Sequence, residues 1–578
     1  MYIVNYHRRV KAVFLFFLVF LIFCIARLFF IKFFRSTYLI GIAKKQHNLY
    51  VELEPRRGTI YDSNLKPQAV NISVESLYAV PYEIPDKDKE AIISKLAPIL
   101  NIDYGYLKDR LYRKKGFIWL ARKITPQRAE AIKKLDIKGL YFIKESKRCY
   151  PNGYLASHII GLAGLDNKGL EGIELYYDRY LKGESGFALF LRDARQRRLG
   201  LYEKMVLPKE GYDLVLTMDE IIQYIAEREL DKAVKKYNAK GASIIVIDPH
   251  SGAILALANR PNFDLNEYVD TNREGLRNRS VCDLFEPGSV LKIVTASAAL
   301  EEAKVTEEDK IFCENGAYRI ATHTLHDHRP HGWLTFREVI EQSSNIGTTK
   351  VAQILGPDIL YRYIRLFGFG SKLGIDLPGE ISGMIKEPRL WSKLSIGAIP
   401  IGQEIGVSAL QLVSAISAIA NGGQLMKPFL VSEIRDKYGE TIKRFPPTLI
   451  RKVVSVDTAS RMKAILAGVI ENGTGKLAKV SDFRVAGKTG TSQKLEPNGT
   501  YSHNKFIASF IGFAPVEDPV IAIVVVVDEP HPYYFGGVVA APVFKNVVND
   551  VLRYLKIESS ANYATALNET NTINQISR

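Results

Sequence analysis

The stretch FEPGSVLKIVT, residues 285–295, places a turn, a hydroxyl and an amine in the order that acyl transfer requires. Pro287-Gly288 marks the turn, Ser289 then opens a helix, and Lys292 follows one helical turn later on the same face. A serine hydroxyl is a weak nucleophile until a base takes its proton, and a lysine in a dry pocket beside other cations can act as that base. The helix N-terminus adds free N–H groups where an oxyanion would develop. We therefore predict that Ser289 is a nucleophile and that Lys292 is its base.

The S-x-x-K spacing alone is a weak signal, because it occurs four times, at Ser63, Ser289, Ser460 and Ser502. Two companion motifs select among these matches. Ser343-Ser344-Asn345 offers a hydroxyl that can relay a proton and an amide that can bind substrate. Lys488-Thr489-Gly490-Thr491, on a predicted strand, can pair with an extended peptide and receive a terminal carboxylate. Only Ser289 is followed at long range by both motifs. The alternative is a capped helix, a polar helix end and a glycine-bearing strand without a common role.

The N-terminal segment Ala12–Ile31 is apolar except for Arg27. Its roughly twenty residues match the ~30 Å hydrocarbon core of a bilayer at ~1.5 Å per residue. A cleaved signal peptide would end in a small-residue cleavage site, and this segment has none, so we expect a retained single-pass anchor. Arg27 lies near the end of the helix and can snorkel to the headgroups. Basic residues flank both ends, so charge does not fix the orientation.

The chain of 578 residues exceeds the ~250–300 residues that one hydrophobic core serves, so we expect several folded units. We predict a tail at 1–11, the anchor at 12–31, a pedestal domain at 32–213, a catalytic domain at 214–556 and a disordered tail at 557–578. The catalytic domain has strands near both its ends and a long helical stretch between them, which indicates one α+β domain. Its predicted strands are Ala242–Asp248, Ala253–Ala258, Lys505–Gly512 and Val520–Val527.

Other classes of function have little support. The net charge is +16, but no dense basic stripe with interleaved aromatics indicates nucleic-acid binding. The four cysteines are too scattered for a disulfide framework, although a Cys282–Cys313 bridge stays open. Clustered histidines in THTLHDHRPHGW, residues 322–333, can bind zinc, but we expect a solvated loop beside the cleft and no metal or cofactor. ENGTGK at Glu471–Lys476 departs from the phosphate-loop pattern, so we interpret it as a helix-ending turn.

At these motifs the sequence resembles the class B penicillin-binding proteins, and most closely their division-specific peptidoglycan transpeptidases. The resemblance covers almost the entire chain. It includes the pedestal motifs RRGTIYD at Arg56–Asp62, RCYPNGYLASHIIGLAG at Arg148–Gly164 and GLEGIE at Gly169–Glu174. Glu286, just before Pro287, is more typical of the division enzyme than of the elongation enzyme. Two departures are that Ser63-Asn64-Leu65-Lys66 replaces the usual arginine and glycine after Asp62, and that we expect no C-terminal cell-wall-binding repeats.

The resemblance implies an α+β fold with a single N-terminal transmembrane helix, an elongated pedestal and a serine β-lactamase-like domain whose central antiparallel sheet is flanked by helices. It implies that Ser289 attacks the penultimate D-alanine of a stem peptide, with Lys292 as base and Ser343 as proton relay. The implied substrate-binding residues are Asn345, Lys488, Thr489, Gly490 and Thr491, and the N–H groups of Ser289 and Thr491 would form the oxyanion hole.

Cross-linking occurs outside the cytoplasmic membrane, so the resemblance implies that residues 1–11 are cytoplasmic and the bulk of the chain is not. It also implies β-lactams as inhibitors, and a SEDS-type glycosyltransferase and other divisome proteins as partners. Three alternatives stay open: an elongation-specific transpeptidase, a membrane-bound β-lactam sensor or β-lactamase, and a divisome scaffold without activity. The anchor and pedestal argue against the hydrolase, and the intact motifs argue against the inactive scaffold.

Overall fold

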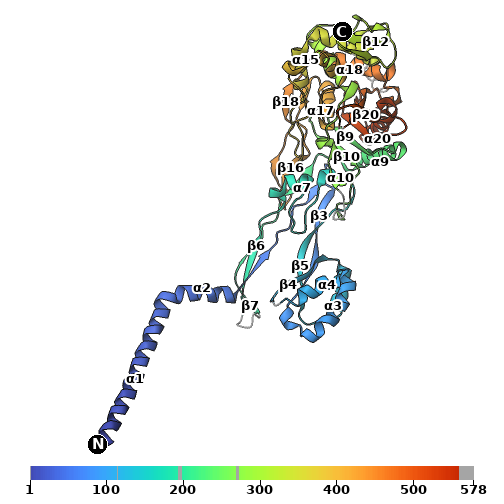
Figure 1. Cartoon of the computed structure of the whole chain (residues 1–578). Coiled ribbons are helices and arrows are strands. Elements are labelled where there is room, and N and C mark those ends of the chain that lie inside the picture. Colours follow the sequence, from blue (N-terminus) through green and yellow to red (C-terminus); the bar gives the residue numbers. More distant parts are fainter. Residues whose placement is uncertain (1, 114, 193–197, 268–272, 497, 559–578) are drawn as a thin grey trace, which may run out of the picture. The chain divides into compact units, whose positions relative to one another are not determined.

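The computed structural model describes residues 2–113, 115–192, 198–267, 273–496 and 498–558. Contacts gather the chain into two units (Figure 1). Unit 1 comprises Met1–Arg56, Ser73–Ser146 and Gly183–Glu210, and unit 2 comprises Arg57–Ile72, Lys147–Lys182 and Gly211–Arg578. The predicted domain boundaries stay predictions, and the predicted disordered tail lies outside the described residues from 559 onward.

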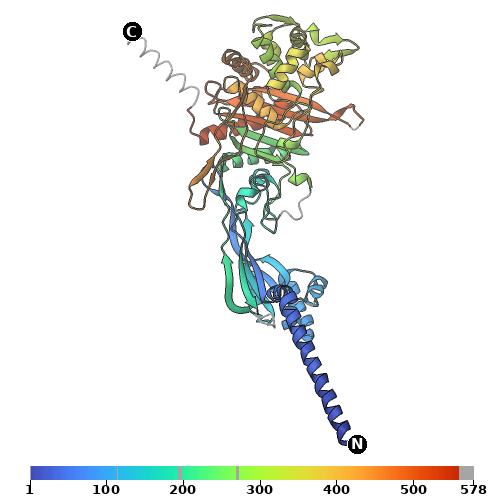
Figure 2. The same cartoon turned by 90° about the vertical axis from the view of Figure 1, so that its left-hand side faces the viewer.

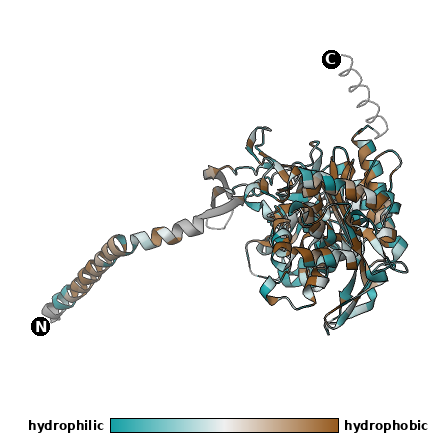
Figure 3. Ribbon diagram, turned by 90° about the horizontal axis from the view of Figure 1, so that it is seen from above, coloured by the Kyte–Doolittle hydropathy of each residue, from teal (hydrophilic) through white to brown (hydrophobic). Residues whose placement is uncertain are grey.

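The N-terminal helix of unit 1 carries the apolar segment. Helix α1, Tyr2–Phe30, continues through one π-helical turn, Ile31–Arg35, into α2, Ser36–His47. From Tyr6 to Ile42 it is long and apolar enough to cross a membrane, and its brown colour in Figure 3 marks the apolar side chains. These side chains are exposed, with Phe14 at 68%. A helix that exposes so many large apolar groups is suited to lipid rather than water.

Unit 1 also contains a small sheet and a helical cluster. The sheet is antiparallel in the order β1-β6-β7, with β1 at Asn48–Leu53, β6 at Gly186–Arg192 and β7 at Arg198–Val206. In the cluster, the later part of β3 pairs with β4 and β5, and three helices pack on them. The bounds are β3 Pro67–Ala79, α3 Asp86–Leu100, α4 Tyr104–Leu111, β4 Ile118–Ile124, α5 Pro126–Lys133 and β5 Leu140–Cys149.

Unit 2 is built on a five-stranded antiparallel sheet in the order β10-β9-β21-β20-β19. The bounds are β9 Gly241–Ile247, β10 Ile254–Arg260, β19 Ala486–Leu495, β20 Tyr501–Ala514 and β21 Ile521–Asp528. Figure 2 shows the orange and red strands β19 to β21 beside the green strands β9 and β10, although a long stretch of sequence separates them. The prediction of one α+β domain with a sheet from distant parts of the chain is confirmed.

Helices cover both faces of this sheet, and the inner strands β9 and β21 bury both rows of their side chains. On one face, α9 (Glu220–Tyr237) and α20 (Ala541–Tyr554) pack against Ile244, Val246 and Val525. On the other face, a larger helical layer packs against Ile245 and Val524. Its main helices are α12 Lys292–Glu301, α13 Phe336–Glu341, α14 Asn345–Leu355, α15 Pro357–Leu366, α17 Ala409–Ala420 and α18 Val456–Glu471.

Shorter elements complete unit 2. A second sheet runs in the order β17-β16-β8-β2, with the first residues of β3 beside β2. Its bounds are β2 Ile60–Tyr61, β8 Asp213–Leu216, β16 Val431–Arg435 and β17 Thr441–Arg444. The short helices are α6 Ser157–Ile160, α7 Gly172–Tyr176, α8 Asp178–Leu181, α10 Arg273–Leu276, α11 Arg279–Cys282, α16 Ser395–Ala398 and α19 Gly536–Val539. The small strands are β11 Lys310–Phe312, β12 Ala317–Ile320, β13 His323–His326, β14 Trp333–Thr335, β15 Gln424–Met426 and β18 Leu449–Lys452.

The three pedestal motifs meet in a buried ion cluster of unit 2. Arg57 Nε donates to Glu174 Oε2 and Arg148 Nε donates to Glu174 Oε1, both at 2.6 Å. Arg57 also reaches Asp178 Oδ1 at 2.7 Å. Arg57 and Glu174 are 1% and 0% exposed, so these charges hold the fold together and do not form a surface.

The turn after Asp62 forms without the glycine that is usual there. Asp62 Oδ1 accepts from the backbone N–H groups of Asn64 and Lys66 at 2.9 and 2.8 Å, and Asp62 N donates to Lys66 O at 2.9 Å. Leu65 has a φ of 60°, in the left-handed region that favours glycine. The aspartate's hydrogen bonds therefore hold a leucine in a strained conformation.

Candidate active site

Ser289 lies in a tight turn in front of α12. Gly288–Leu291 forms a short 3₁₀ turn, and Lys292 begins the α-helix, as the spacing predicts. Gly288 has a φ of 57°, and a Cβ there would lie 2.7 Å from Thr491 O. Its N–H donates to Gly402 O at 3.1 Å. A glycine is required because the turn both needs a left-handed residue and passes close to β19.

The strand β19 lies directly against this turn. A Cβ on Gly490 would come within 2.5 Å of Val290 Cγ2 and within 2.9 Å of Pro287 O. Gly490 therefore allows the strand to pack closely against the turn that carries Ser289. The edge position of β19 in the sheet leaves its outer backbone groups available to an extended peptide.

Lys292 is fully buried and connects the first two motifs. Its Nζ donates to Ser343 O at 2.6 Å, to Asn345 Oδ1 at 2.8 Å and to Ser343 Oγ at 3.1 Å. All three acceptors belong to the second motif, and Lys292 follows Ser289 by one helical turn in the chain.

Lys488 brings the third motif to the same hydroxyl. Its Nζ donates to Ser343 Oγ at 2.9 Å, so two lysines share one serine oxygen. Ser343 has a φ of 60°, an uncommon left-handed conformation for a serine, in the turn between α13 and α14. The strained turn presents both the hydroxyl and the carbonyl of Ser343 to the lysines.

Both lysines have lowered pKa values. Burial lowers the pKa of Lys488 from 10.5 to about 7. Burial, and then the nearby charge of Lys488, lower the pKa of Lys292 well below its ordinary value. Desolvation disfavours a charged amine, and a neighbouring cation disfavours it further. The site therefore makes an unprotonated lysine accessible near neutral pH, as a general base requires.

The two threonines of the third motif differ in their surroundings. Thr489 is buried, and its Oγ1 lies 2.9 Å from Thr474 Oγ1, in the segment that ends α18. Thr491 is half-buried, and its Oγ1 accepts from Gly536 N at 3.0 Å. Strand alternation points Lys488 to the opposite face of β19 from both threonines. Thr474 belongs to the segment Glu471–Lys476, whose prediction as a helix-ending turn is confirmed.

Asp327 is a site residue that the sequence analysis missed. Its Oδ1 accepts from Asn345 N at 2.6 Å, and its Oδ2 accepts from Ser344 Oγ at 2.6 Å. It therefore caps the N-terminus of α14 and fixes the second motif. His326 O also accepts from Asn345 Nδ2 at 2.9 Å. The histidine segment is largely exposed, but His323–His326 form strand β13 instead of the predicted loop, and His326 O supports the site.

A row of aromatic rings was also missed. Phe506 stacks on Tyr534 at 4.0 Å between ring centroids, Tyr534 lies 4.4 Å from Phe535, and Phe535 lies 4.8 Å from His328. The row leads into Gly536, whose N–H binds Thr491. The run Tyr533-Tyr534-Phe535 before Gly536-Gly537 was its only signal in the sequence.

The described residues hold no group of three or more His, Cys, Asp or Glu side chains arranged for a metal ion. All four cysteines are free, so Cys282 and Cys313 are not bridged.

Comparison with known families agrees with both parts of this architecture. Residues 242–549 match the penicillin-binding protein transpeptidase domain, and residues 52–216 match the penicillin-binding protein dimerisation domain.

Individual relatives match over nearly the whole chain. Stage V sporulation protein D of Bacillus subtilis is 36% identical over 97% of this chain and 88% of its own. Peptidoglycan D,D-transpeptidase FtsI of Escherichia coli is 33% identical over 88% of this chain and 85% of its own. A crystal structure of penicillin-binding protein 3 from Mycobacterium tuberculosis, complexed with aztreonam, has a TM-score of 0.69 at 26% identity, covering 88% of this chain and 98% of that one.

Proposed function

Because the chain belongs to the class B penicillin-binding proteins and is a peptidoglycan D,D-transpeptidase, we propose that Ser289 carries the acyl group and that the enzyme serves septal wall synthesis. The observation that carries the first part is the shared hydroxyl of Ser343, which accepts from both Lys292 and Lys488. Among the S-x-x-K serines, Ser289 is the one that lies one helical turn before Lys292, which takes part in these hydrogen bonds.

In the proposed acylation, Ser289 Oγ attacks the carbonyl carbon between the two terminal D-alanines of a donor stem peptide. Lys292 Nζ takes the hydroxyl proton, and the backbone N–H groups of Ser289 and Thr491 stabilise the oxyanion. The carbon–nitrogen bond then breaks, and the Ser343 hydroxyl passes a proton to the amine of the leaving D-alanine. An amine from a neighbouring stem attacks the ester, forms the cross-link and frees Ser289.

The binding roles follow from the position of each group. Lys488 would face the terminal carboxylate of the donor, with Thr491 at the open side of β19. Thr489 would act through Thr474, which its hydroxyl contacts. Asn345 would hold the donor peptide, and its side chain lies between Lys292 and His326 O.

The test of the nucleophile is covalent labelling with a fluorescent penicillin. We expect Ser289→Ala to abolish the adduct, whereas Ser460→Ala and Ser502→Ala, in the other S-x-x-K matches of the catalytic domain, should keep it. Labelled Ser289→Ala would contradict the assignment. The lifetime of the wild-type adduct separates a transpeptidase, with slow release, from a β-lactamase, with rapid release.

Support for the septal role comes from the identity of Glu286, because a glutamate just before Pro287 is more typical of the division enzyme than of the elongation enzyme. A wall-synthesis role in sporulation is a second candidate, favoured by the similarity to stage V sporulation protein D over 97% of this chain. Depletion of the protein in growing cells distinguishes them. Filaments without septa support the septal role, normal growth with defective spores supports the second, and loss of rod shape supports lateral-wall synthesis.

We further propose that α1 anchors the chain with residues 1–11 in the cytoplasm and recruits a SEDS-type glycosyltransferase and other divisome proteins. The test replaces Ala12–Ile31 with an unrelated spanning helix. Recruitment predicts that penicillin labelling survives while co-purification with the polymerase and division fail. If the variant binds the polymerase and divides normally, α1 is only an anchor. Arg57→Glu is unsuitable as a companion variant because Arg57 is buried.

A further inference from the structure

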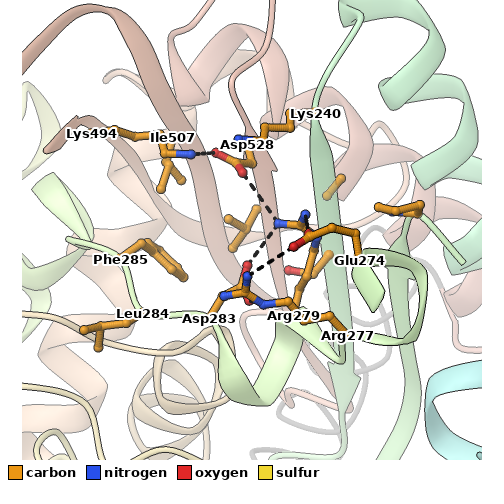
Figure 4. Close-up of a pocket in the computed structure, with 14 residues that line it drawn as sticks. Lys240, Glu274, Arg277, Arg279, Asp283, Leu284, Phe285, Lys494, Ile507 and Asp528 are labelled. Carbon is orange, nitrogen blue, oxygen red and sulfur yellow. Dashed lines mark hydrogen bonds and ion pairs between the residues drawn. The ribbon is translucent and has the colours of Figure 1, made fainter. Parts of the chain in front are cut away.

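Two cavities of unit 2 have similar sizes. The charged side chains that line the first form ion pairs with one another, whereas, among the described residues, the cations that line the second do not. The first, of about 330 Å³, lies behind the nucleophile turn and has Phe285 on its wall (Figure 4). Its charged side chains pair with one another: Arg279 with Glu274 at 3.0 Å, Arg279 with Asp283 at 3.1 Å, and Lys494 with Asp528 at 2.8 Å. These ion pairs match the cations of the lining with acids, although Arg279 Nε itself has no hydrogen-bond partner among the described residues.

The second cavity, of about 320 Å³, is lined by residues of α7, α8 and β16 and by the segment Lys443–Thr448. Its only acidic lining residue is Asp376, which is 7% exposed. The Asp376 carboxylate accepts from Leu430 N at 2.7 Å, Val431 N at 2.9 Å and Tyr177 OH at 3.0 Å. The fold therefore uses this acid internally and leaves its charge unavailable to the cavity.

Three exposed cations face the same cavity: Arg179, Lys427 and Lys443. In the part of the chain that the structure describes, none of them forms an ion pair with an acid. Arg179 lies 4.6 Å over the ring of Tyr180, and Lys443 lies 4.8 Å over the ring of Phe445. Like charges around one cavity repel each other, so this arrangement is unfavourable for the fold and favourable for an anion.

The aromatic walls narrow the class of ligand. Tyr176 is 50% exposed, and Tyr180 and Phe445 are half-buried, so flat ring faces and tyrosine hydroxyls border the cations. Such rings bind flat groups with C–H faces, while the cations bind carboxylates. A molecule that combines several carboxylates with sugar rings and peptide bonds satisfies both.

We propose that this cavity is a second, non-catalytic binding site for a carboxylate-bearing glycopeptide segment of peptidoglycan. The inference rests on the transpeptidase activity, since the polymer that the enzyme cross-links carries sugar rings and stem-peptide carboxylates together. A polymer held at a second site presents its neighbouring stems to the catalytic site at an effective concentration of about millimolar, if its length matches the span. The cavity would thus retain the wall polymer between successive cross-links.

The test uses the full-length protein in detergent, with its catalytic site occupied by a penicillin adduct. An uncross-linked disaccharide–pentapeptide is titrated, and binding is followed by calorimetry. We expect saturable binding that is weaker for the disaccharide alone and for the peptide alone. Lys427→Gln with Lys443→Gln should weaken it roughly twofold to thirtyfold, because the double variant removes two exposed cations that would each pair with a ligand carboxylate.

The matched control is Lys437→Gln. Lys437 is an exposed lysine on the turn after β16, held 5.1 Å over the ring of Tyr438, and it does not line the cavity. The Lys437→Gln variant should bind the disaccharide–pentapeptide as tightly as the wild type does. Equal binding by the double variant and the wild type would overturn the proposal. If polyglutamate at the same carboxylate concentration displaces the disaccharide–pentapeptide completely, the cavity binds acidic peptides and the proposed wall-polymer ligand is wrong. The penicillin adduct, measured by mass, reports separately on the function proposed for Ser289.

Discussion

The substitution Lys292→Arg tests whether Lys292 acts as a general base or only as a fixed positive charge. Lys292 is fully enclosed, and its Nζ has three acceptors, on Ser343 and Asn345. A guanidinium can donate to the same oxygens and keep the positive charge, but it stays protonated up to a pH of about 12. It therefore cannot take the proton of Ser289. The burial that lowers the pKa of Lys292 has no comparable effect on an arginine's ability to act as a base.

We expect the second-order rate of penicillin acylation to fall by roughly 10²–10⁴, the usual contribution of a general base. This corresponds to about 3–5 kcal/mol of activation free energy. In the wild type, acylation should increase with pH as Lys292 loses its proton, beginning well below the ordinary lysine range. The rate of the arginine variant should show no such rise between pH 6 and 9.

The assay is rapid-mixing fluorescence with a labelled penicillin across that pH range. Lys463→Arg, in the S-x-x-K match at Ser460, is the matched control and should acylate normally. Lys292→Met removes both base and charge at similar length, and we expect an equally large loss. Because arginine is larger, the thermal midpoint of each variant shows whether the fold survives. Acylation by Lys292→Arg within threefold of the wild type, with the same pH profile, would refute the base assignment.

Three further predictions follow from buried charges. Lys488→Met should raise the thermal midpoint: the pKa of Lys488 is about 7 in the fold and about 10.5 unfolded, a difference that destabilises the fold by up to about 4 kcal/mol near pH 7. Between these two pKa values the unfolded chain binds more protons than the folded chain. The gain in thermal midpoint from Lys488→Met should therefore shrink as the pH rises from 7 to 10.5. A gain that is independent of pH would contradict the lowered pKa of Lys488. Asp327→Ala should slow acylation and lower stability by about 1–2 kcal/mol, because it removes the cap on Asn345 N, and unchanged acylation would show that the cap does not position the site. Arg57→Glu should lower the free energy of unfolding by roughly 3–5 kcal/mol by placing a carboxylate beside buried Glu174, and a normal urea midpoint would exclude that cost.

The sequence predicted the parts of the fold that depend on local pattern. The helix-ending turn predicted at Glu471–Lys476 forms where α18 ends at Glu471. The hairpin expected after residue 242 forms as β9 and β10. The three motifs were expected to converge, and the hydrogen bonds of Ser343 show that they do.

The sequence did not predict contacts between residues that are far apart in the chain. Asp327 binds Ser344, which lies 17 positions later with β14 and α13 in between, and no periodicity links the two positions. Thr474 meets Thr489 only because α18 ends beside β19. Arg57 is buried although arginine is usually exposed, because Glu174 reaches it from a distant segment.

The strand order of the central sheet has a consequence for how the protein is made. Strand β9 is buried along its whole length, yet its neighbour β21 lies hundreds of residues later in the chain. During synthesis from the N-terminus, β9 and β10 emerge first and expose an apolar edge until the last strands arrive. Such an edge can pair with the same segment of another nascent chain, and long-range pairing is slow to form. Production of this enzyme therefore depends on factors that shield the early hairpin, and a polypeptide cut short before β21 would aggregate rather than wait in a partly active form.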